Sequence, residues 1–312
     1  MSTQFLTPRM AGVLERIRRA NRPAFHTLSA EQARAAYGAG AEVLDLPRAR
    51  LDKVEDMRVP GADGTELAAR RYRPVVASRG TLLYLHGGGF TIGGLETHDS
   101  LCRQLALLSG AQVLALDYRL APEHRFPTAV DDTWATLRWL REQGAALGFD
   151  SDRLAVGGDS AGGTLAAVAA ILSRDHGLPL RAQLLITPGT TAHADTATHK
   201  LFANGFLLDA VTIEWFFEQY IDRSQRSDWR FAPLNADSLD GVAPACVLLA
   251  ECDPLCDEGL AYADRLRLAG VEVSLELYRG MTHDFIKMGR VPNVARHAQA
   301  AAGDALRRAF EP

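Results

Sequence analysis

One serine lies in a short motif whose spacing suits a nucleophile. The sequence GDSAG at residues 158–162 places Ser160 at the centre of the pattern G-x-S-x-G. An apolar run at 154–156 precedes the motif and an Ala-rich helical pattern at 161–174 follows it, which predicts a strand–turn–helix. Such a sharp turn needs small neighbours, and the helix N-terminus directs N–H groups at the site. A glycine-rich turn with a serine helix cap is the alternative, but this context favours a nucleophile.

A second glycine-rich motif could stabilise negative charge. The sequence HGGGF at residues 86–90 follows an apolar run at 82–85. Consecutive glycines leave backbone N–H groups open to a ligand, and a tetrahedral intermediate needs such donors in place before its charge develops. We expect the N–H groups of Gly88, Gly89 and Ala161 to form the oxyanion hole, and His86 to hold the loop. A phosphate-binding loop is a poor alternative, because no G-x-x-x-x-G-K-[ST] occurs.

The order of residues along the chain selects a general base. Hydrolases with an elbow of this kind carry the serine first, then an acid, then a histidine. Two histidines, His283 and His297, follow a plausible acid strand. His297 falls inside the last predicted helix, whereas His283 lies in a loop just after the last predicted strand. We therefore predict His283 as the base, against the alternative of a solvated loop histidine.

The acid should follow the apolar run at residues 247–250. Its candidates are Glu251, Asp253, Asp257 and Glu258. Asp253 precedes a proline, which favours an extended conformation and keeps it out of the next helix. Asp257 and Glu258 are placed to cap that helix instead. We choose Asp253 to orient the imidazole, although a solvated carboxylate stays possible at this stage.

The elements that must position these residues have the pattern of a parallel sheet. Short continuous apolar runs are typical of strands buried on both faces, and helical patterns alternate with them along the chain. This alternation predicts a doubly wound α/β fold with its site at the carboxyl ends of the strands. The predicted strands are residues 54–59, 67–72, 82–85, 113–116, 154–156, 184–186, 247–250 and 271–278.

Two further segments could cover the site. Residues 1–45 contain two helical patterns, and residues 187–227 separate two strands by far more than one helix. This insertion includes an aromatic helical stretch at 212–220, which suggests a lid. We predict a single domain over residues 1–312 whose cap comprises about 1–45 and 187–227. The alternative is a helix packed on the flank of the sheet.

Together these motifs resemble the hormone-sensitive-lipase-like family of bacterial esterases. The resemblance rests on HGGG at 86–89, YRLAPEH at 118–124, GDSAGG at 158–163, DPLCDEG at 253–259 and GMTH at 280–283. It covers the chain from about residue 81 to the end. It implies an α/β-hydrolase fold with a mostly parallel eight-stranded sheet, a helical cap and no cofactor. The family's catalytic residues would correspond to Ser160, Asp253 and His283.

Two positions depart from the family pattern. Thr164 stands where Asn is common, and Cys256 stands where Arg is common. These two departures put the fine tuning of the expected active site in doubt, but not the type of reaction.

The function expected from these residues is that of a serine carboxylesterase. Ser160 would attack short- to medium-chain esters and form an acyl-enzyme. Phe206, Trp215 and Phe216 are candidate walls of the substrate pocket, although a role as core aromatics is about as plausible. An amidase or formamidase on the same triad remains an alternative. A non-catalytic receptor-like protein is a third possibility, and the presence of His283 argues against it.

Composition excludes several other classes of protein. The chain has 34 basic and 38 acidic residues, a net charge of −4, which offers no electrostatic footprint for nucleic acid. No stretch approaches the roughly 18 apolar residues that a membrane span needs.

The C-x₃-C pair Cys252 and Cys256 lacks the second ligand pair of a zinc site, so we expect no metal. Four cysteines also suggest a cytoplasmic protein with reduced thiols. The family resemblance adds a possible homodimer.

Overall fold

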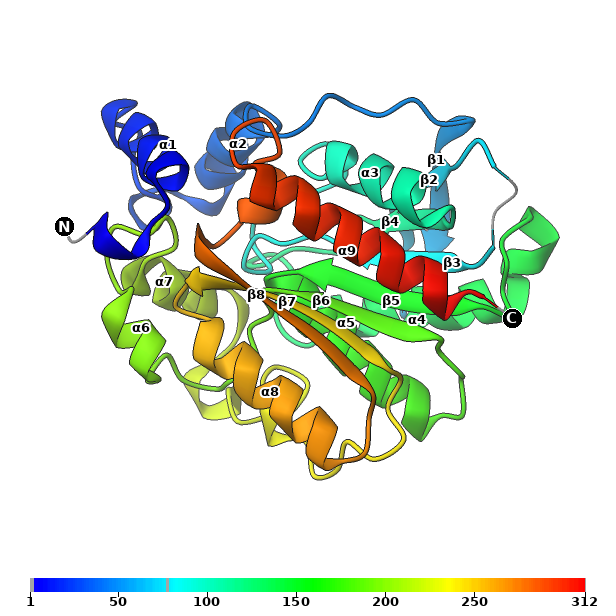
Figure 1. Cartoon of the computed structure of the whole chain (residues 1–312). Helices are drawn as coiled ribbons and strands as arrows, with labels where there is room; N and C mark the ends of the chain where they lie inside the picture. Colours follow the sequence, from blue (N-terminus) through cyan, green and yellow to red (C-terminus); the bar gives the residue numbers. More distant parts are fainter. Residues whose placement is uncertain (1–2, 77–78, 312) are drawn as a thin grey trace.

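The computed structural model describes residues 3–76 and 79–311, and eight strands of this part form one sheet (Figure 1). The strand order is β1-β2-β4-β3-β5-β6-β7-β8. The strands are β1 (Lys53–Pro60), β2 (Glu66–Arg73), β3 (Thr81–Leu85), β4 (Gln112–Leu116), β5 (Leu154–Asp159), β6 (Ala182–Ile186), β7 (Ala245–Cys252) and β8 (Val273–Thr282).

The prediction of a mostly parallel sheet is confirmed. β2 pairs antiparallel with both β1 and β4, and the pairs from β4 to β8 are parallel. Every residue of β3, β4, β5 and β6 is buried, which explains why these strands appear as continuous apolar runs. β8 extends to Thr282, beyond the predicted end at residue 278, so His283 follows the strand directly.

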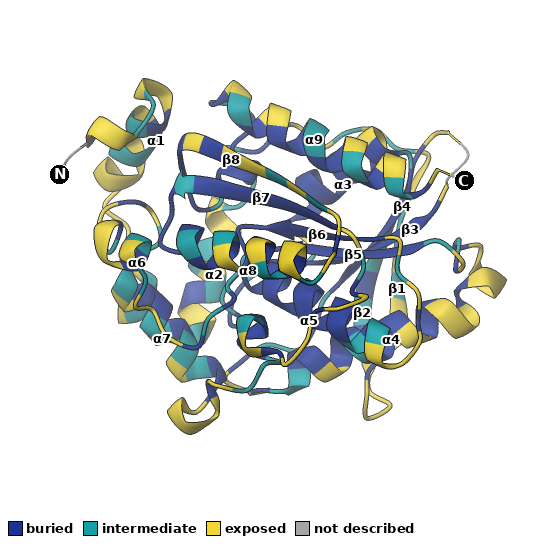
Figure 2. Ribbon diagram, turned by 60° about the horizontal axis from the view of Figure 1, so that its bottom comes forward, coloured by how far each residue is buried: buried dark blue, intermediate teal, exposed yellow. Residues whose placement is uncertain are grey.

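Helices cover both faces of the sheet in two layers (Figure 1). One layer contains α3 (Asp99–Ser109) and α9 (Asn293–Ala309), and the other contains α4 (Thr128–Gln143), α5 (Ala161–Asp175) and α8 (Cys256–Leu268). Each layer contributes to its own hydrophobic cluster against the sheet. α5 is buried along most of its length, as its dark blue ribbon shows in Figure 2. The helix that follows Ser160 is therefore fixed in the core.

The N-terminal segment and the insertion lie at the end of the sheet where β7 and β8 finish (Figure 1). The N-terminal segment contains η1 (Thr3–Phe5), α1 (Pro8–Arg19), η2 (Phe25–Thr27) and α2 (Ala30–Gly40). α2 begins with a capping box, since Ser29 and Gln32 exchange side chain–backbone hydrogen bonds. Residues 1–2 of the predicted cap lie outside the described residues.

The insertion is longer than the predicted residues 187–227. The segment between β6 and β7 runs over residues 187–244 and contains α6 (Ala197–Leu201), α7 (Ala210–Tyr220), η4 (Arg223–Gln225) and η5 (Pro233–Asn235). The sequence pattern missed its last part, because that part consists of turns and one-turn helices without a clear hydrophobic period.

The N-terminal segment also contacts the end of β8. The N–H of Thr7 donates to the carbonyl of Gly280 at 3.3 Å. The hydroxyl of Thr282 donates to the sulfur of Met10 at 3.8 Å, and Met10 is fully buried. Because His283 is the next residue, the N-terminal segment packs directly beside the loop that carries it.

Candidate active site

Ser160 occupies a strained turn between β5 and α5. Its φ of 54° and ψ of −122° are unusual for a residue with a side chain. The neighbouring glycines allow this turn, since a Cβ on Gly158 would lie 2.4 Å from the carbonyl oxygen of Leu85, and one on Gly162 would lie 1.9 Å from it. The predicted strand–turn–helix is confirmed. Ser160 is thus the single residue between the end of β5 and the start of α5.

The structure brings together the three side chains selected from the sequence. His283 Nε2 lies 2.9 Å from Ser160 Oγ, and His283 Nδ1 lies 2.7 Å from Asp253 Oδ2. Asp253 is fully buried, and its other carboxylate oxygen accepts the N–H of Leu255 at 2.9 Å. The three residues follow β5, β7 and β8, whose carboxyl ends meet at one edge of the sheet.

Asp253 makes His283 a stronger base. Burial disfavours the charged imidazolium, but the negative charge and hydrogen bond of Asp253 outweigh burial and raise the pKa of His283 to about 9. Asp284, whose Oδ1 lies 4.0 Å from His283 Nε2, acts in the same direction. The arrangement can therefore accept a proton from the Ser160 hydroxyl.

The glycine loop after β3 lies against the insertion. Gly88 and Gly89 have φ values of 123° and 56°, which favour glycine. A Cβ on Gly88 would lie 2.2 Å from the carbonyl oxygen of Ile92, and a Cβ on Gly89 would lie 2.2 Å from the ring of Phe216. Ala161 is the first residue of α5, where N–H groups have no partner within the helix.

A buried carboxylate that the sequence did not single out holds this loop. Asp159 Oδ1 accepts the hydroxyl of Tyr84 at 2.5 Å and the N–H of Gly87 at 3.2 Å. Its Oδ2 lies 3.2 Å from Nε2 of His98. Burial disfavours the charged form, but His98 and the other donors hold the pKa of Asp159 below its usual range. Asp159 could have been found from the sequence as an ionisable residue at the end of a buried strand, because a buried carboxylate needs hydrogen-bond partners.

His86 has the supporting role that the sequence predicted. Its ring stacks on Tyr118 at 4.3 Å between centroids, and its Nδ1 lies 2.8 Å from the carbonyl oxygen of Gly87. The hydroxyl of Tyr118 donates to the His86 carbonyl at 2.7 Å. Burial, with His98 nearby, lowers the pKa of His86 to about 3, so this ring is neutral at pH 7.

The three aromatic candidates for the pocket do not form a single wall. Trp215 and Phe216 belong to a cluster beside the glycine loop. Phe206 belongs to a second cluster with Phe202 and Cys252, the residue before Asp253. Spacing along the insertion could not separate these positions, because the chain bends repeatedly over residues 203–208 before α7 begins.

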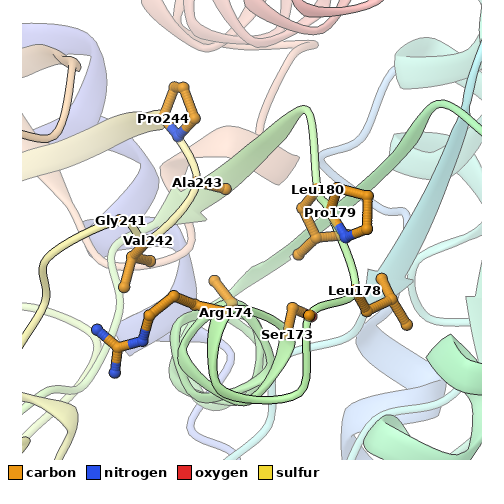
Figure 3. A pocket seen from close by; sticks show the side chains of 11 residues that line it. Ser173, Arg174, Leu178, Pro179, Leu180, Gly241, Val242, Ala243 and Pro244 are labelled. Carbon is orange, nitrogen blue, oxygen red and sulfur yellow. The ribbon is translucent and has the colours of Figure 1, made fainter.

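Other possible sites lie away from these side chains. Among the described residues, no group of three or more His, Cys, Asp or Glu side chains could hold a metal ion. A hollow of about 350 Å³ lies between the end of α5 and residues 241–244 (Figure 3). It adjoins the amino ends of β6 and β7, opposite to the edge that carries Ser160, and its lining includes none of the three.

Comparison with known proteins identifies the family. Residues 82–287 match the model of a family with the α/β-hydrolase fold. The chain belongs to this family. The resemblance to hormone-sensitive-lipase-like esterases is confirmed by relatives such as the ethyl acetate hydrolase of Pseudomonas putida, which is 42% identical over 90% of this chain and 91% of the relative. The carboxylic ester hydrolase LipN of Mycobacterium tuberculosis is 44% identical over 82% of this chain and 70% of its own length.

Solved structures of such hydrolases share the fold of this α/β hydrolase. An α/β-hydrolase enzyme from the metagenome of Lake Arreo superposes with a TM-score of 0.94 and 39% identity, covering 98% of this chain and 99% of the other. The hyperthermophilic esterase of Pyrobaculum calidifontis superposes with a TM-score of 0.91 and 34% identity, covering 97% and 98%. The likeness extends over the N-terminal segment and the insertion as well as the sheet.

Proposed function

We propose that this α/β hydrolase cleaves short- to medium-chain carboxylic esters through an acyl-enzyme formed on Ser160. Its class, carboxylic ester hydrolase, is shown by relatives of 34–44% identity that bear such names. One observation carries the assignment of residues: a continuous hydrogen-bonded chain runs from Ser160 through His283 to Asp253. This arrangement activates a hydroxyl for attack on a carbonyl carbon.

Acylation begins with proton transfer from Ser160 Oγ to His283 Nε2 as the hydroxyl attacks the ester. Asp253 keeps the imidazole in the required tautomer and stabilises the imidazolium. The N–H groups of Gly88, Gly89 and Ala161 donate to the oxyanion of the tetrahedral intermediate. His283 then protonates the leaving alkoxide, and the acyl group stays on the serine.

Deacylation repeats the same steps with water in place of the alcohol. Water gives its proton to His283 and attacks the acyl carbonyl. As the second intermediate collapses and releases the acid, His283 returns this proton to Ser160 Oγ, which restores the hydroxyl and the neutral imidazole. Every proton in this cycle moves through a group of the chain itself. The mechanism therefore needs no cofactor and no metal.

We propose that the N-terminal segment and the insertion form a cap on the single domain. Two contacts support this proposal: Phe216 packs against Gly89 of the glycine loop, and Phe206 packs in a cluster with Cys252, the residue before Asp253. With Trp215 these side chains would wall the acyl and alcohol sites from two sides. Such walls favour short chains over long ones, because a confined site limits the length that fits.

We further propose a homodimer in the cytoplasm. β8 is an edge strand of the sheet, and such an edge can pair with a second copy. The four cysteines are free thiols, as in proteins of reducing compartments. No helix within the described residues is long and apolar enough to cross a membrane. Light scattering at micromolar concentration tests the dimer, and a monomer mass would contradict it.

The decisive experiment compares wild type with Ser160→Ala on nitrophenyl esters of two to twelve acyl carbons. Wild type should hydrolyse the acetate and butyrate fastest, and the alanine variant should lose at least about 10⁴-fold in kcat. Matched anilides of the same acids distinguish an amidase. An alanine variant that keeps its rate would remove Ser160 from the mechanism, and a faster anilide would reassign the reaction.

A further inference from the structure

The loop after β6 separates the two sides of the candidate triad. β6 pairs with β5 on one side and with β7 on the other. Ser160 follows β5 and Asp253 follows β7, whereas the mechanism proposed above uses no residue of the loop 187–191. This loop is the spacer between the nucleophile and the acid.

The helix of the nucleophile holds the spacer from one side. Thr164 lies in the first turn of α5, and its hydroxyl donates to the carbonyl of Gly189 at 2.6 Å. Its own N–H donates to the carbonyl of Ser160 at 3.0 Å. Pro188 packs closely on Gly163, since a Cβ added to Gly163 would lie 3.1 Å from the Pro188 side chain. The spacer is thus seated on the turn that carries Ser160.

The helix of the acid holds the spacer from the other side through Glu258. The prediction that Glu258 caps its own helix is wrong, because its side chain reaches across to the spacer. Its Oε1 accepts the N–H groups of Thr190 and Thr191, the latter at 3.2 Å, and its Oε2 accepts the Thr191 hydroxyl at 3.0 Å. The Thr190 hydroxyl returns a bond to the Glu258 carbonyl at 2.9 Å.

His199 completes the surroundings of this buried carboxyl group. Glu258 and His199 are each 3% exposed, and His199 Nε2 lies 3.2 Å from Glu258 Oε2. Burial raises the pKa of Glu258 to about 8 against the donors that lower it. In either protonation state Oε1 can accept the two backbone N–H groups, so its grip on the spacer does not depend on charge.

Asp253 is part of the same rigid unit as Glu258. Its carbonyl accepts the N–H of Cys256 at 3.1 Å, and α8 begins at that residue. Gly259 packs against β7, since a Cβ there would lie 2.6 Å from Leu249. A shift in the start of α8 therefore moves the carboxylate that orients His283.

We propose that Glu258 is a positioning residue: together with Thr164 it clamps residues 189–191 and sets the place of Asp253 relative to Ser160. The inference rests on the triad proposed above. It acts through geometry, since an error of about 1 Å in a catalytic group can cost roughly 10²-fold in rate. Glu258 need not touch the substrate, so its loss should affect turnover more than binding.

The test compares Glu258→Ala with Glu258→Gln on nitrophenyl acetate. The alanine variant should lose about 10- to 100-fold in kcat, with KM within about threefold of wild type. The glutamine variant keeps an acceptor for both N–H groups, and its kcat should stay within about threefold. A glutamine variant as slow as the alanine variant, or an alanine variant with wild-type kcat, would overturn the proposal.

One further pair of variants and one control variant keep the test independent of folding. Thr164→Val removes the hydroxyl bonded to Gly189 with little change of shape, and should lower kcat severalfold, whereas Thr164→Ser should restore it. Asp132 lies on α4, and Asp132→Ala removes a fully buried carboxylate that accepts hydrogen bonds from Arg119 and from no residue of the triad or the clamp. It should lower the melting temperature and leave kcat unchanged.

The control also separates the clamp from general stability and from the triad. If Asp132→Ala reduces kcat as much as Glu258→Ala at equal loss of melting temperature, Glu258 is merely structural and the proposal fails. If the wild-type protein does not hydrolyse esters, the proposed function itself is contradicted. If the wild type is active and Glu258→Ala is equally active, only the proposed clamp is contradicted.

Discussion

Phe216 of the insertion lies so close to Gly89 of the glycine loop that a Cβ at residue 89 would be 2.2 Å from the phenyl ring. The contact joins two segments that are more than 120 residues apart in the sequence. It fixes the loop that is expected to bind the oxyanion against the proposed cap. Any side chain at residue 89 must displace either the ring or the backbone N–H groups.

Gly89→Ala should therefore lower kcat on nitrophenyl acetate by about 10²-fold, the usual effect of losing one oxyanion donor. Both the contact with Phe216 and the φ of 56° act against the alanine. Gly64→Ala is the matched control, because Gly64 has a φ of 82° but open space around its Cβ position. It should cost about 1 kcal/mol of stability and no activity. Equal kcat values for the two variants would contradict a role of the loop in catalysis.

Asp253→Asn should leave the fold intact and reduce kcat by about 10³- to 10⁴-fold. The amide can still contact His283 at the 2.7 Å position, but it neither stabilises the imidazolium nor selects the required tautomer. Steady-state kinetics together with circular dichroism separate this effect from unfolding. A loss of less than tenfold would mean that another carboxylate orients the base.

The pH dependence of kcat/KM should report His283 as the base. The ring accepts the Ser160 proton only when it is neutral, and burial and Asp253 together place its pKa at about 9. Activity should rise with pH through that value and fall on its acidic side. In Asp253→Asn the same limb should move to lower pH, because the charge that raises the pKa is gone. An unmoved limb would assign the ionisation to another group.

Asp45 should make stability depend on pH. Its side chain is 1% exposed, neither oxygen has a hydrogen-bond partner among the described residues, and burial raises its pKa to about 7. The folded protein then binds a proton that the unfolded chain releases near pH 4. The free energy of unfolding that this proton contributes is therefore fully present below about pH 4, and it is lost as the pH rises from there through the folded-state pKa of about 7.

Asp45→Asn removes that titration. Relative to wild type, the variant should gain about 2–3 kcal/mol on going from pH 5 to pH 8, as urea unfolding at the two pH values would measure. Lys287, whose buried ammonium donates to Tyr37 at 2.8 Å, lies near Asp45 and lowers its pKa. The same difference between the proteins at both pH values would show that Asp45 does not titrate in this range.

Local rules were enough to predict most of the strands and helices and the three side chains that the structure brings together, Ser160, His283 and Asp253. Ser160 was found from a turn that tolerates only small neighbours, and the structure shows this crowding at Gly158 and Gly162. His283 and Asp253 followed from chain order and strand ends, because parallel strands bring their carboxyl ends to one edge. Short-range sterics and sheet topology therefore determine the location of the candidate site.

The contacts that support this site were decided by the tertiary structure. Tyr84 bonds to Asp159 across 75 residues, and Thr190 bonds to Glu258 across 68. Such long-range hydrogen bonds leave no periodic pattern in a single sequence, because each side chain could equally face solvent or cap its own helix. Burial selects the long-range partner, because a buried carboxyl group must accept hydrogen bonds from whichever donors the fold brings near it. The sequence by itself determined which residues could do the chemistry, and only the packing of distant segments decided what holds them in place.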